Sequence, residues 1–432
     1  MKYIVAILIF GIIVFIHELG HFLFAKANGI KVEEFAIGMG PTFFSVTRKE
    51  TKYSLKLLPL GGSCMMLGED ESSTDSRAFN NKSVWARFSV VFAGPLFNFV
   101  LAFVLALILI GMAGGDTPNV ISVEDNSPAA LAGIQEGDLI KKYNGATIGV
   151  GREIYLEDFV NPIGEEPIEI VYERNGERTE TTLQPELKKR YLMGVNYTAD
   201  DAPLEVTVAA GGAMEQVGVK DGDVIVAIDG VEVQTGKDFY EYNQEHPLTA
   251  EPRKITYTRD GEENTVEVTP VENEYYVTGF EYNCNSADSN QKVGLLGNIK
   301  YSALEIRYQI KSVIMSLKYL FSGNFSADSV AGPVGIVNIV GDSYTQSMEY
   351  GWIAVFETMT SLCIMLSANL GVMNLLPIPA LDGGRLLFMI VEMIRGKKMD
   401  PDKEGFVHFI GFVLLMGLMV VILFNDIRNI IK

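Results

Sequence analysis

Residues 3–25 read YIVAILIFGIIVFIHELGHFLFA, and this stretch decides how the rest of the chain is interpreted. No charge occurs from residue 4 to residue 16, and the apolar run continues past Glu18 to Phe24. The run is long enough to cross the roughly 30 Å hydrocarbon core of a bilayer. A secretory signal peptide begins in a similar way, but no small-residue cleavage site follows here. The stretch therefore predicts a transmembrane helix over residues 1–25.

Inside this helix lies the motif HELGH, residues 17–21. Its two histidines are four positions apart, on one helix face, where neutral imidazoles can hold zinc while Glu18 acts as a general base. The motif also occurs by chance in soluble helices. An ionisable group within a membrane helix costs roughly 2.5–3.5 kcal/mol on insertion scales, so three polar groups in one turn call for a compensating partner. A bound metal would supply that partner.

A catalytic zinc normally has three protein ligands and one open position, so two histidines are not enough. The remaining histidines, His246 and His408, lie in a polar region and beside a different apolar run. Asp382 is a better candidate, in the segment NLLPIPALDGG at residues 374–384. Two prolines there interrupt a helix, and the two glycines allow close backbone approach. Leu-Asp-Gly-Gly alone is typical of a turn, but together with HELGH it predicts a third ligand.

These motifs resemble the site-2 protease family of intramembrane zinc metalloproteases, in particular the bacterial branch that carries PDZ domains and cleaves anti-sigma factors. The resemblance covers nearly the whole chain. It implies Zn²⁺ bound by His17, His21 and Asp382, with Glu18 as the catalytic base. It also implies four residues that would take part in substrate binding: Asn374, Pro377, Gly38 and Gly40.

Composition agrees with a membrane protein that has polar parts. The chain has 432 residues, of which 48% are hydrophobic, and its mean hydropathy is +0.19. Its three cysteines, Cys64, Cys284 and Cys363, lie in different segments and form no CxxC pair. Disulfide bonds are therefore not expected to be part of the design.

The net charge of −19 is concentrated in one part of the chain. Residues 114–290 contain 35 acidic and 13 basic residues, a net charge of −22. Such a surface disfavours nucleic acid and anionic lipid as partners and keeps a domain solvated. The acidic part is expected to be a soluble insert in a membrane protein.

Residues 26–87 predict a β-hairpin, because two β-prone stretches, 32–46 and 53–67, flank the polar segment RKETK. By resemblance this region would be a re-entrant, membrane-associated hairpin beside the active site, with Gly38 and Gly40 in its GxG element. A helix hides its peptide bonds, so a protease must hold its substrate as a strand, and an exposed strand edge does this. An ordinary cytosolic hairpin is the alternative.

Three more apolar stretches, residues 88–110, 353–376 and 405–424, complete a prediction of four transmembrane helices. Asn98 lies in the first of them, where an amide usually bonds a neighbouring helix, so a packing role is expected rather than a catalytic one. Residues 292–320 predict a basic amphipathic helix, which lies either on a lipid surface or against one of the soluble domains.

The acidic insert contains an internal repeat with an offset of 85 residues. Strands joined by Asn-Gly and Asp-Gly turns surround both copies. The pattern resembles two tandem PDZ domains, over residues 116–195 and 196–275. They would either bind extended peptide or exclude bulky substrates by size. The clearest matched pairs are Gly133 with Gly218, Gly137 with Gly222, and Asp138 with Asp223.

Charge asymmetry predicts the orientation of the spans. The loop over residues 26–87 carries nine Lys and Arg, and residues 377–404 carry five, so both are expected in the cytoplasm. The PDZ pair would then be extracytoplasmic, and His17 and Asp382 would both lie near the cytoplasmic ends of their spans. The protein is expected in the plasma membrane.

The sequence thus predicts an α-helical polytopic membrane protein of four spans, with an inserted pair of β-rich α+β PDZ domains and a membrane-associated hairpin. Its predicted function is zinc-dependent hydrolysis of a peptide bond in or next to the transmembrane segment of a single-span protein, an anti-sigma factor or a remnant signal peptide, in regulated intramembrane proteolysis. Two alternatives are a catalytically inactive, membrane-anchored PDZ adaptor and a zinc transporter. A transporter would need polar ligands on several spans, and only one such cluster is evident.

Overall fold

The computed structural model describes residues 2–69, 73–285, 290–321, 332–399 and 401–431. The chain forms two compact units, which are described separately. The first contains residues up to 118, residues 148–160 and residues from 283 onward, and the second contains 119–147 and 161–282.

Within the described residues, four helices of the first unit are long and apolar enough to cross a membrane. They agree with the four spans predicted from sequence, and each is a few residues longer or shifted by one. The helices are α1 (Lys2–Ala27), α2 (Val84–Ala113), α9 (Trp352–Leu375) and the Glu404–Asp426 part of α11 (Pro401–Ile431).

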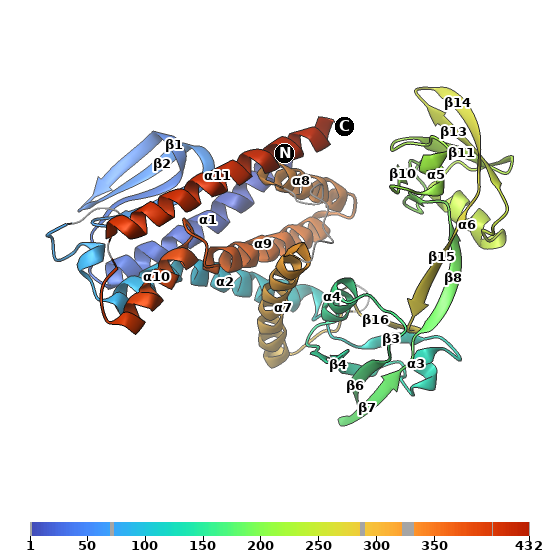
Figure 1. The fold of residues 1–432 in the computed structure, drawn as a ribbon, viewed down its shortest axis with the longest axis horizontal. Coiled ribbons are helices and arrows are strands. Elements are labelled where there is room, and N and C mark those ends of the chain that lie inside the picture. Colours follow the sequence, from blue (N-terminus) through green and yellow to red (C-terminus); the bar gives the residue numbers. More distant parts are fainter. Residues whose placement is uncertain (1, 70–72, 286–289, 322–331, 400, 432) are drawn as a thin grey trace. The chain divides into compact units, whose positions relative to one another are not determined.

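Small residues allow α1, α2 and α9 to pack closely side by side (Figure 1). A Cβ on Gly20 of α1 would lie only 2.3 Å from the carbonyl oxygen of Ala93 on α2. Between α2 and α9, Ala102 and Ala106 are buried against Ala368. Helix α2 therefore lies between α1 and α9 with little space for larger side chains.

Two further helices of the first unit are fixed to the spans by charged side chains. Arg87 of α2 pairs with Glu392 of α10 at 2.5 Å, and both side chains are largely buried. Asp426 of α11 accepts hydrogen bonds from the backbone N–H groups of Gly332 and Gly335 at 2.9 Å, and so caps α8. These helices are α8 (Pro333–Glu349) and α10 (Asp382–Arg395).

The predicted hairpin is present, but both of its long strands bend, so that one segment of each pairs with two segments of the other. Strand β1 (Val32–Arg48) pairs with β2 (Thr51–Met66), and Ile37 has Cα partners in both Leu55 and Gly62. The sheet therefore has four segments, with residues 42–48 and 62–66 at its edges. Glycines with positive φ permit these bends: Gly38, Gly40 and Gly61. A short 3₁₀ helix, Phe79–Asn81, follows before α2.

The second unit contains two similar four-stranded sheets among its described residues. The first has the order β5-β4-β6-β7 and the second β12-β11-β13-β14. The strands are β4 (Leu139–Tyr143), β5 (Ala146–Thr147), β6 (Ile168–Arg174), β7 (Glu177–Leu183), β11 (Val224–Ile228), β12 (Val231–Glu232), β13 (Arg253–Arg259) and β14 (Glu262–Val268). Short helices accompany them: α3 (Pro128–Leu131), α5 (Ala213–Gln216) and α6 (Gly236–Glu245).

The two repeats are nested rather than consecutive. Strand β16, which follows the second repeat, pairs with β3 at the start of the first. The second repeat is one continuous stretch of the chain and begins with the pair β9–β10. Strand β8, before this stretch, pairs with β15, after it. The first repeat thus extends beyond the predicted residues 116–195, which no regular spacing signalled. The strands are β3 (Val120–Val123), β8 (Glu186–Leu192), β9 (Val195–Asn196), β10 (Thr207–Val208), β15 (Val271–Val277) and β16 (Phe280–Tyr282).

Helix α7 (Leu295–Phe321) corresponds to the predicted amphipathic helix, and its basic side chains contact α4 (Arg152–Val160) within the first unit. Arg307 pairs with the fully buried Glu153 at 2.5 Å, and Lys311 pairs with Glu157 at 2.7 Å. These ion pairs join α7 to α4 of the first unit, and both predicted settings of α7, a lipid surface or a soluble domain, stay predictions.

Candidate metal centre

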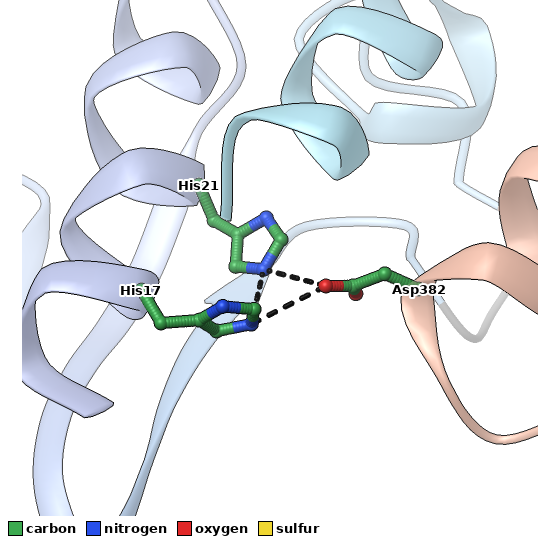
Figure 2. Close-up of side chains that lie close together, drawn as sticks. All are labelled: His17, His21 and Asp382. Carbon is green, nitrogen blue, oxygen red and sulfur yellow. Dashed lines mark hydrogen bonds and ion pairs between the residues drawn. The ribbon is translucent and has the colours of Figure 1, made fainter. Parts of the chain in front are cut away.

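Two histidines from α1 and one aspartate from α10 converge at a buried point between the helices (Figure 2). Asp382 Oδ2 lies 3.2 Å from His17 Nε2 and 3.4 Å from His21 Nε2. The two Nε2 atoms are 3.2 Å apart. Among the described residues, this is the one group of three or more His, Cys, Asp or Glu that could hold a metal ion. The structure therefore brings together the three ligands predicted from sequence.

The connection between α9 and α10 brings Asp382 to this point. Helix α10 begins at Asp382, and the next two residues are packed against the preceding turn. A Cβ on Gly383 would lie 2.1 Å from the carbonyl oxygen of Leu376, and one on Gly384 would lie 2.5 Å from that of Ile378. Only glycine fits at both positions, which is the physical reason for the LDGG sequence.

The side chains present fit a zinc ion. Asp382 Oδ2 is buried and accepts no hydrogen bond of acceptable geometry, although both Nε2 atoms are nearby. A buried carboxylate oxygen is unfavourable without a partner, and a cation between the three atoms would provide one. Two imidazoles and one carboxylate form a typical donor set for catalytic zinc and leave a fourth position open.

Helix α2 covers the two histidines from one side. His21 Nδ1 lies 2.9 Å from the carbonyl oxygen of Val90, so Nδ1 carries the proton and Nε2 keeps its lone pair. One turn later, a Cβ on Gly94 would lie 2.3 Å from His21 Nε2, so no side chain can be present there. Another turn later, the amide of Asn98 lies 3.2 Å from His17 Nδ1. Asn98 was expected to pack between helices, but its side chain lies against a candidate ligand.

Glu18 lies between α1 and the edge of the β-sheet. A Cβ on Gly62 of β2 would lie 2.8 Å from Glu18 Cγ, so this glycine provides the space for the glutamate side chain. Glu18 is close enough to both histidines and to Asp382 for electrostatic interaction. Gly62 could not be predicted as a site residue, because nothing in its sequence surroundings distinguishes it from a turn glycine.

The four residues expected to bind substrate lie in two segments, one in strand β1 and the other from the end of α9 into the turn before α10. Gly38 and Gly40 are in β1, directly after Ile37, whose partner is Gly62. Asn374 is half-buried at the end of α9, and Pro377 is exposed in the turn that leads to Asp382. Asn374 and Pro377 lie shortly before Asp382 in the sequence. The role of all four residues in substrate binding stays a prediction.

The two other histidines lie outside the cluster. His246 is at the end of α6 in the second unit. His408 of α11 accepts a hydrogen bond at Nδ1 from the backbone N–H of Ala380, at 2.9 Å. Ala380 has a positive φ of 77°, unusual for alanine, so His408 supports the strained turn before Asp382. No sequence pattern links His408 to that turn.

Comparison with known proteins identifies the class that this centre defines. Residues 5–418 match the model of Peptidase family M50, so the chain belongs to this family. It is a zinc metalloendopeptidase of the site-2 protease type, as predicted, and a multi-pass membrane protein.

Curated relatives are similar along nearly their whole length. A Clostridium acetobutylicum protein is 35% identical, with 98% of this chain and 96% of that protein covered. Zinc metalloprotease RasP of Geobacillus kaustophilus is 34% identical, with 98% and 97% covered. Regulator of sigma-W protease RasP of Bacillus subtilis is 30% identical, with 98% and 97% covered. Among solved structures, an HtrA3 PDZ domain matches 21% of this chain and 93% of its own with a TM-score of 0.18, which is too low to support an argument.

Proposed function

We propose that His17, His21 and Asp382 bind the zinc ion and that Glu18 is the general base for hydrolysis of a peptide bond in or next to a substrate's transmembrane segment. The observation that carries this proposal is the convergence of three donor atoms, two from α1 and one from α10. Glu18 lies beside them on α1, a helix apolar enough to span a membrane. An inactive adaptor would have no need for this arrangement.

The roles of the side chains follow from their positions. His17, His21 and Asp382 would hold the zinc ion, which would supply Lewis-acid chemistry: polarisation of the scissile carbonyl and a lower pKa of the attacking water. Glu18 accepts the proton from that water and returns it to the leaving amine. The Val90 carbonyl keeps the His21 imidazole in the tautomer with a free Nε2. Gly62 leaves space for the Glu18 side chain beside β2.

The sheet edge supports presentation of the substrate as a strand. Residues 62–66 form an outer segment of the β1–β2 sheet and run beside Glu18. An unwound substrate segment could add to such an edge through backbone hydrogen bonds. Gly38 and Gly40 bend strand β1 through their positive φ, and Asn374 and Pro377 precede Asp382 in the chain. By their resemblance to the family's motifs, we assign these four residues to substrate binding.

The substrate proposed is a single-span membrane protein, with an anti-sigma factor favoured over a remnant signal peptide. The name of the Bacillus subtilis relative, Regulator of sigma-W protease, supports this choice. We further propose that the two repeats of the second unit are PDZ domains outside the cytoplasm, and that the metal centre lies near the cytoplasmic side of the plasma membrane. The excess of Lys and Arg in residues 26–87 and 377–404 supports this orientation.

The test uses purified full-length wild type, Glu18→Gln and Asp382→Ala in detergent. Zinc content is counted, and each protein is incubated with a single-span model substrate. Wild type should hold about one zinc and cleave, Glu18→Gln should hold zinc without cleaving, and Asp382→Ala should hold less zinc. Cleavage by Glu18→Gln would disprove the assignment of the base. Zinc binding unaffected by Asp382→Ala would disprove the ligand set.

A further inference from the structure

Asn98 of α2 is fully buried in the first unit, and the oxygen of its side-chain amide has no hydrogen-bond partner. Its Nδ2 lies 3.2 Å from His17 Nδ1, whereas its Oδ1 is buried and makes no hydrogen bond. A buried amide oxygen without a partner is costly, because it has given up its hydrogen bonds to water. The Asn98 Oδ1 atom near His17 is therefore a hydrogen-bond acceptor without a donor.

The tautomer of His17 gives this oxygen a hydrogen-bond donor. If His17 Nε2 binds zinc, its lone pair is used there and the ring proton must be on Nδ1, which is then a hydrogen-bond donor. Asn98 Nδ2 is also a donor, and two donors at 3.2 Å do not bond. The oxygen and nitrogen of an amide have nearly the same size, so rotating the group by half a turn leaves the packing unchanged. Asn98 Oδ1 then faces the Nδ1–H group.

We propose that Asn98 is a positioning residue for His17, and that its Oδ1 accepts the hydrogen bond from His17 Nδ1–H. This fixes the ring orientation and directs the lone pair of Nε2 toward the metal position. The inference rests on the proposed ligand set. It makes the two histidines equivalent, because the Val90 carbonyl accepts from His21 Nδ1 in the same way.

The spacing on α2 explains why one helix serves both rings. Val90, Gly94 and Asn98 follow one another at intervals of four residues and so lie on one face. The face offers an acceptor, a space without a side chain, and a second acceptor. The backbone oxygen of Asn98, not its side chain, accepts a hydrogen bond from the buried Ser367 Oγ of α9 at 2.9 Å.

The experiment compares four full-length proteins in detergent: wild type, Asn98→Asp, Asn98→Leu and Ser367→Ala. The dissociation constant for zinc is measured by competition with a chelator. Asn98→Leu should bind zinc about 10- to 100-fold more weakly, the usual effect of losing such a partner. Asn98→Asp should bind close to wild type, because its carboxylate accepts the same bond. Ser367→Ala perturbs the α2–α9 contact without removing the acceptor, so it should also bind close to wild type.

A second readout separates positioning from packing. The thermal unfolding midpoint is measured with zinc and after chelation for each protein. If Asn98 positions His17, zinc should raise the unfolding midpoint of Asn98→Leu less than that of wild type. If Asn98 only packs between helices, the midpoint of the zinc-free Asn98→Leu protein should be lower. If Asn98→Leu does not fold, Asn98→Ala takes its place in the comparison with Asn98→Asp.

Two results would overturn the inference: wild-type zinc affinity in the apolar variant, or an Asp variant as weak as the apolar one. The second would mean that Asn98 donates its N–H rather than accepts. Both are distinct from failure of the proposed function, in which wild-type zinc binding would not depend on Asp382 at all.

Discussion

At the scale of single residues, the metal centre depends as much on missing side chains as on those present. Gly20 and Gly94 let α1 approach α2 until the two imidazoles touch its backbone, and Gly383 and Gly384 let α10 begin against the preceding turn. These glycines carry no chemistry of their own. They determine whether the residues that do carry chemistry can reach one point.

Gly94→Ala should therefore abolish zinc binding and cleavage. Alanine is favoured over glycine in a helix by about 0.8–1 kcal/mol, but here its methyl group would lie 2.3 Å from His21 Nε2 and 2.8 Å from His17 Cε1. Zinc content and substrate cleavage measure the effect. Gly11→Ala is the matched control on α1, because nothing lies within 4 Å of its Cβ position. A Gly94→Ala protein that keeps its zinc would show that the rings move freely.

The sequence predicted the donors of this centre but not their supports. HELGH and Asp382 are recognisable because zinc chemistry demands particular residue types at particular spacing. The Val90 carbonyl could not be predicted, because every residue has one and only the three-dimensional packing selects it. Asn98 could be seen as a polar residue in an apolar span, but its partner on another helix could not.

At the scale of elements, the structure explains the aspartate that recurs in the 85-residue repeat. Asp138 pairs with Arg174 at 2.7 Å, and Asp223 pairs with Arg259 at 2.6 Å. In both repeats the arginine also donates to a glycine carbonyl. Each buried aspartate thus joins the start of a sheet to its third strand in the chain.

Asp223→Asn should destabilise the second repeat in a pH-dependent way. Burial alone would raise the pKa of Asp223, but Arg259 and the Lys220 backbone N–H outweigh it and lower the pKa below the ordinary 3.8. A lowered folded-state pKa gives stability that is present above pH 3.8 and lost as pH falls through the folded value. At pH 7 the variant should be roughly 2–3 kcal/mol less stable.

Hydrogen exchange of β11 and β13 in the full chain measures this effect. The difference between wild type and Asp223→Asn should shrink as pH falls below 4. Asp201→Asn is the control, because that side chain is 90% exposed. A difference that stays constant with pH would mean that the hydrogen bonds survive protonation.

The repeat pattern predicted the two sheets well and their surroundings poorly. Turn sequences and alternation specify the strands within 85 residues, but β9 and β16 lie at its margins and are too short to stand out. Helix α4 follows β5 and helix α6 follows β12, so the two helices are equivalent in chain order, although α4 belongs to the first unit. Of these two helices, α4 has buried carboxylates that pair with α7. The sequence does not distinguish α4 from α6 in this respect unless α7 is already known to be the partner of α4.

At the scale of the whole molecule, zinc should link the first and last thirds of the chain. His17 and His21 are on α1 and Asp382 is on α10, so an ion held by these three residues would bind only the folded arrangement. Ligand at 100 times its dissociation constant stabilises a protein by about 2.7 kcal/mol. Chelation should thus lower the unfolding midpoint of wild type. The midpoint of Asp382→Ala should hardly change, and an equal drop in both would place the stabilising metal elsewhere.

The orientation in the membrane has a test that needs no added cysteine. Cys64 and Cys363 are buried and Cys284 is exposed. If residues 114–290 are extracytoplasmic, a membrane-impermeant maleimide should label intact cells that express the chain, and Cys284→Ser should abolish that labelling. Labelling that appears only after the cells are permeabilised would show that residues 114–290 lie in the cytoplasm and that the predicted orientation is wrong.

The nesting of the repeats also sets an order of assembly during synthesis. The second repeat is one continuous stretch, so it can complete its sheet as soon as β14 has been made. Val123 of β3 must wait for Phe280, about 160 positions later, or roughly 8–30 s at typical translation rates. During that time its edge is open to wrong partners. A slow-folding variant of the second repeat would therefore expose the first to misfolding, whereas the reverse does not hold.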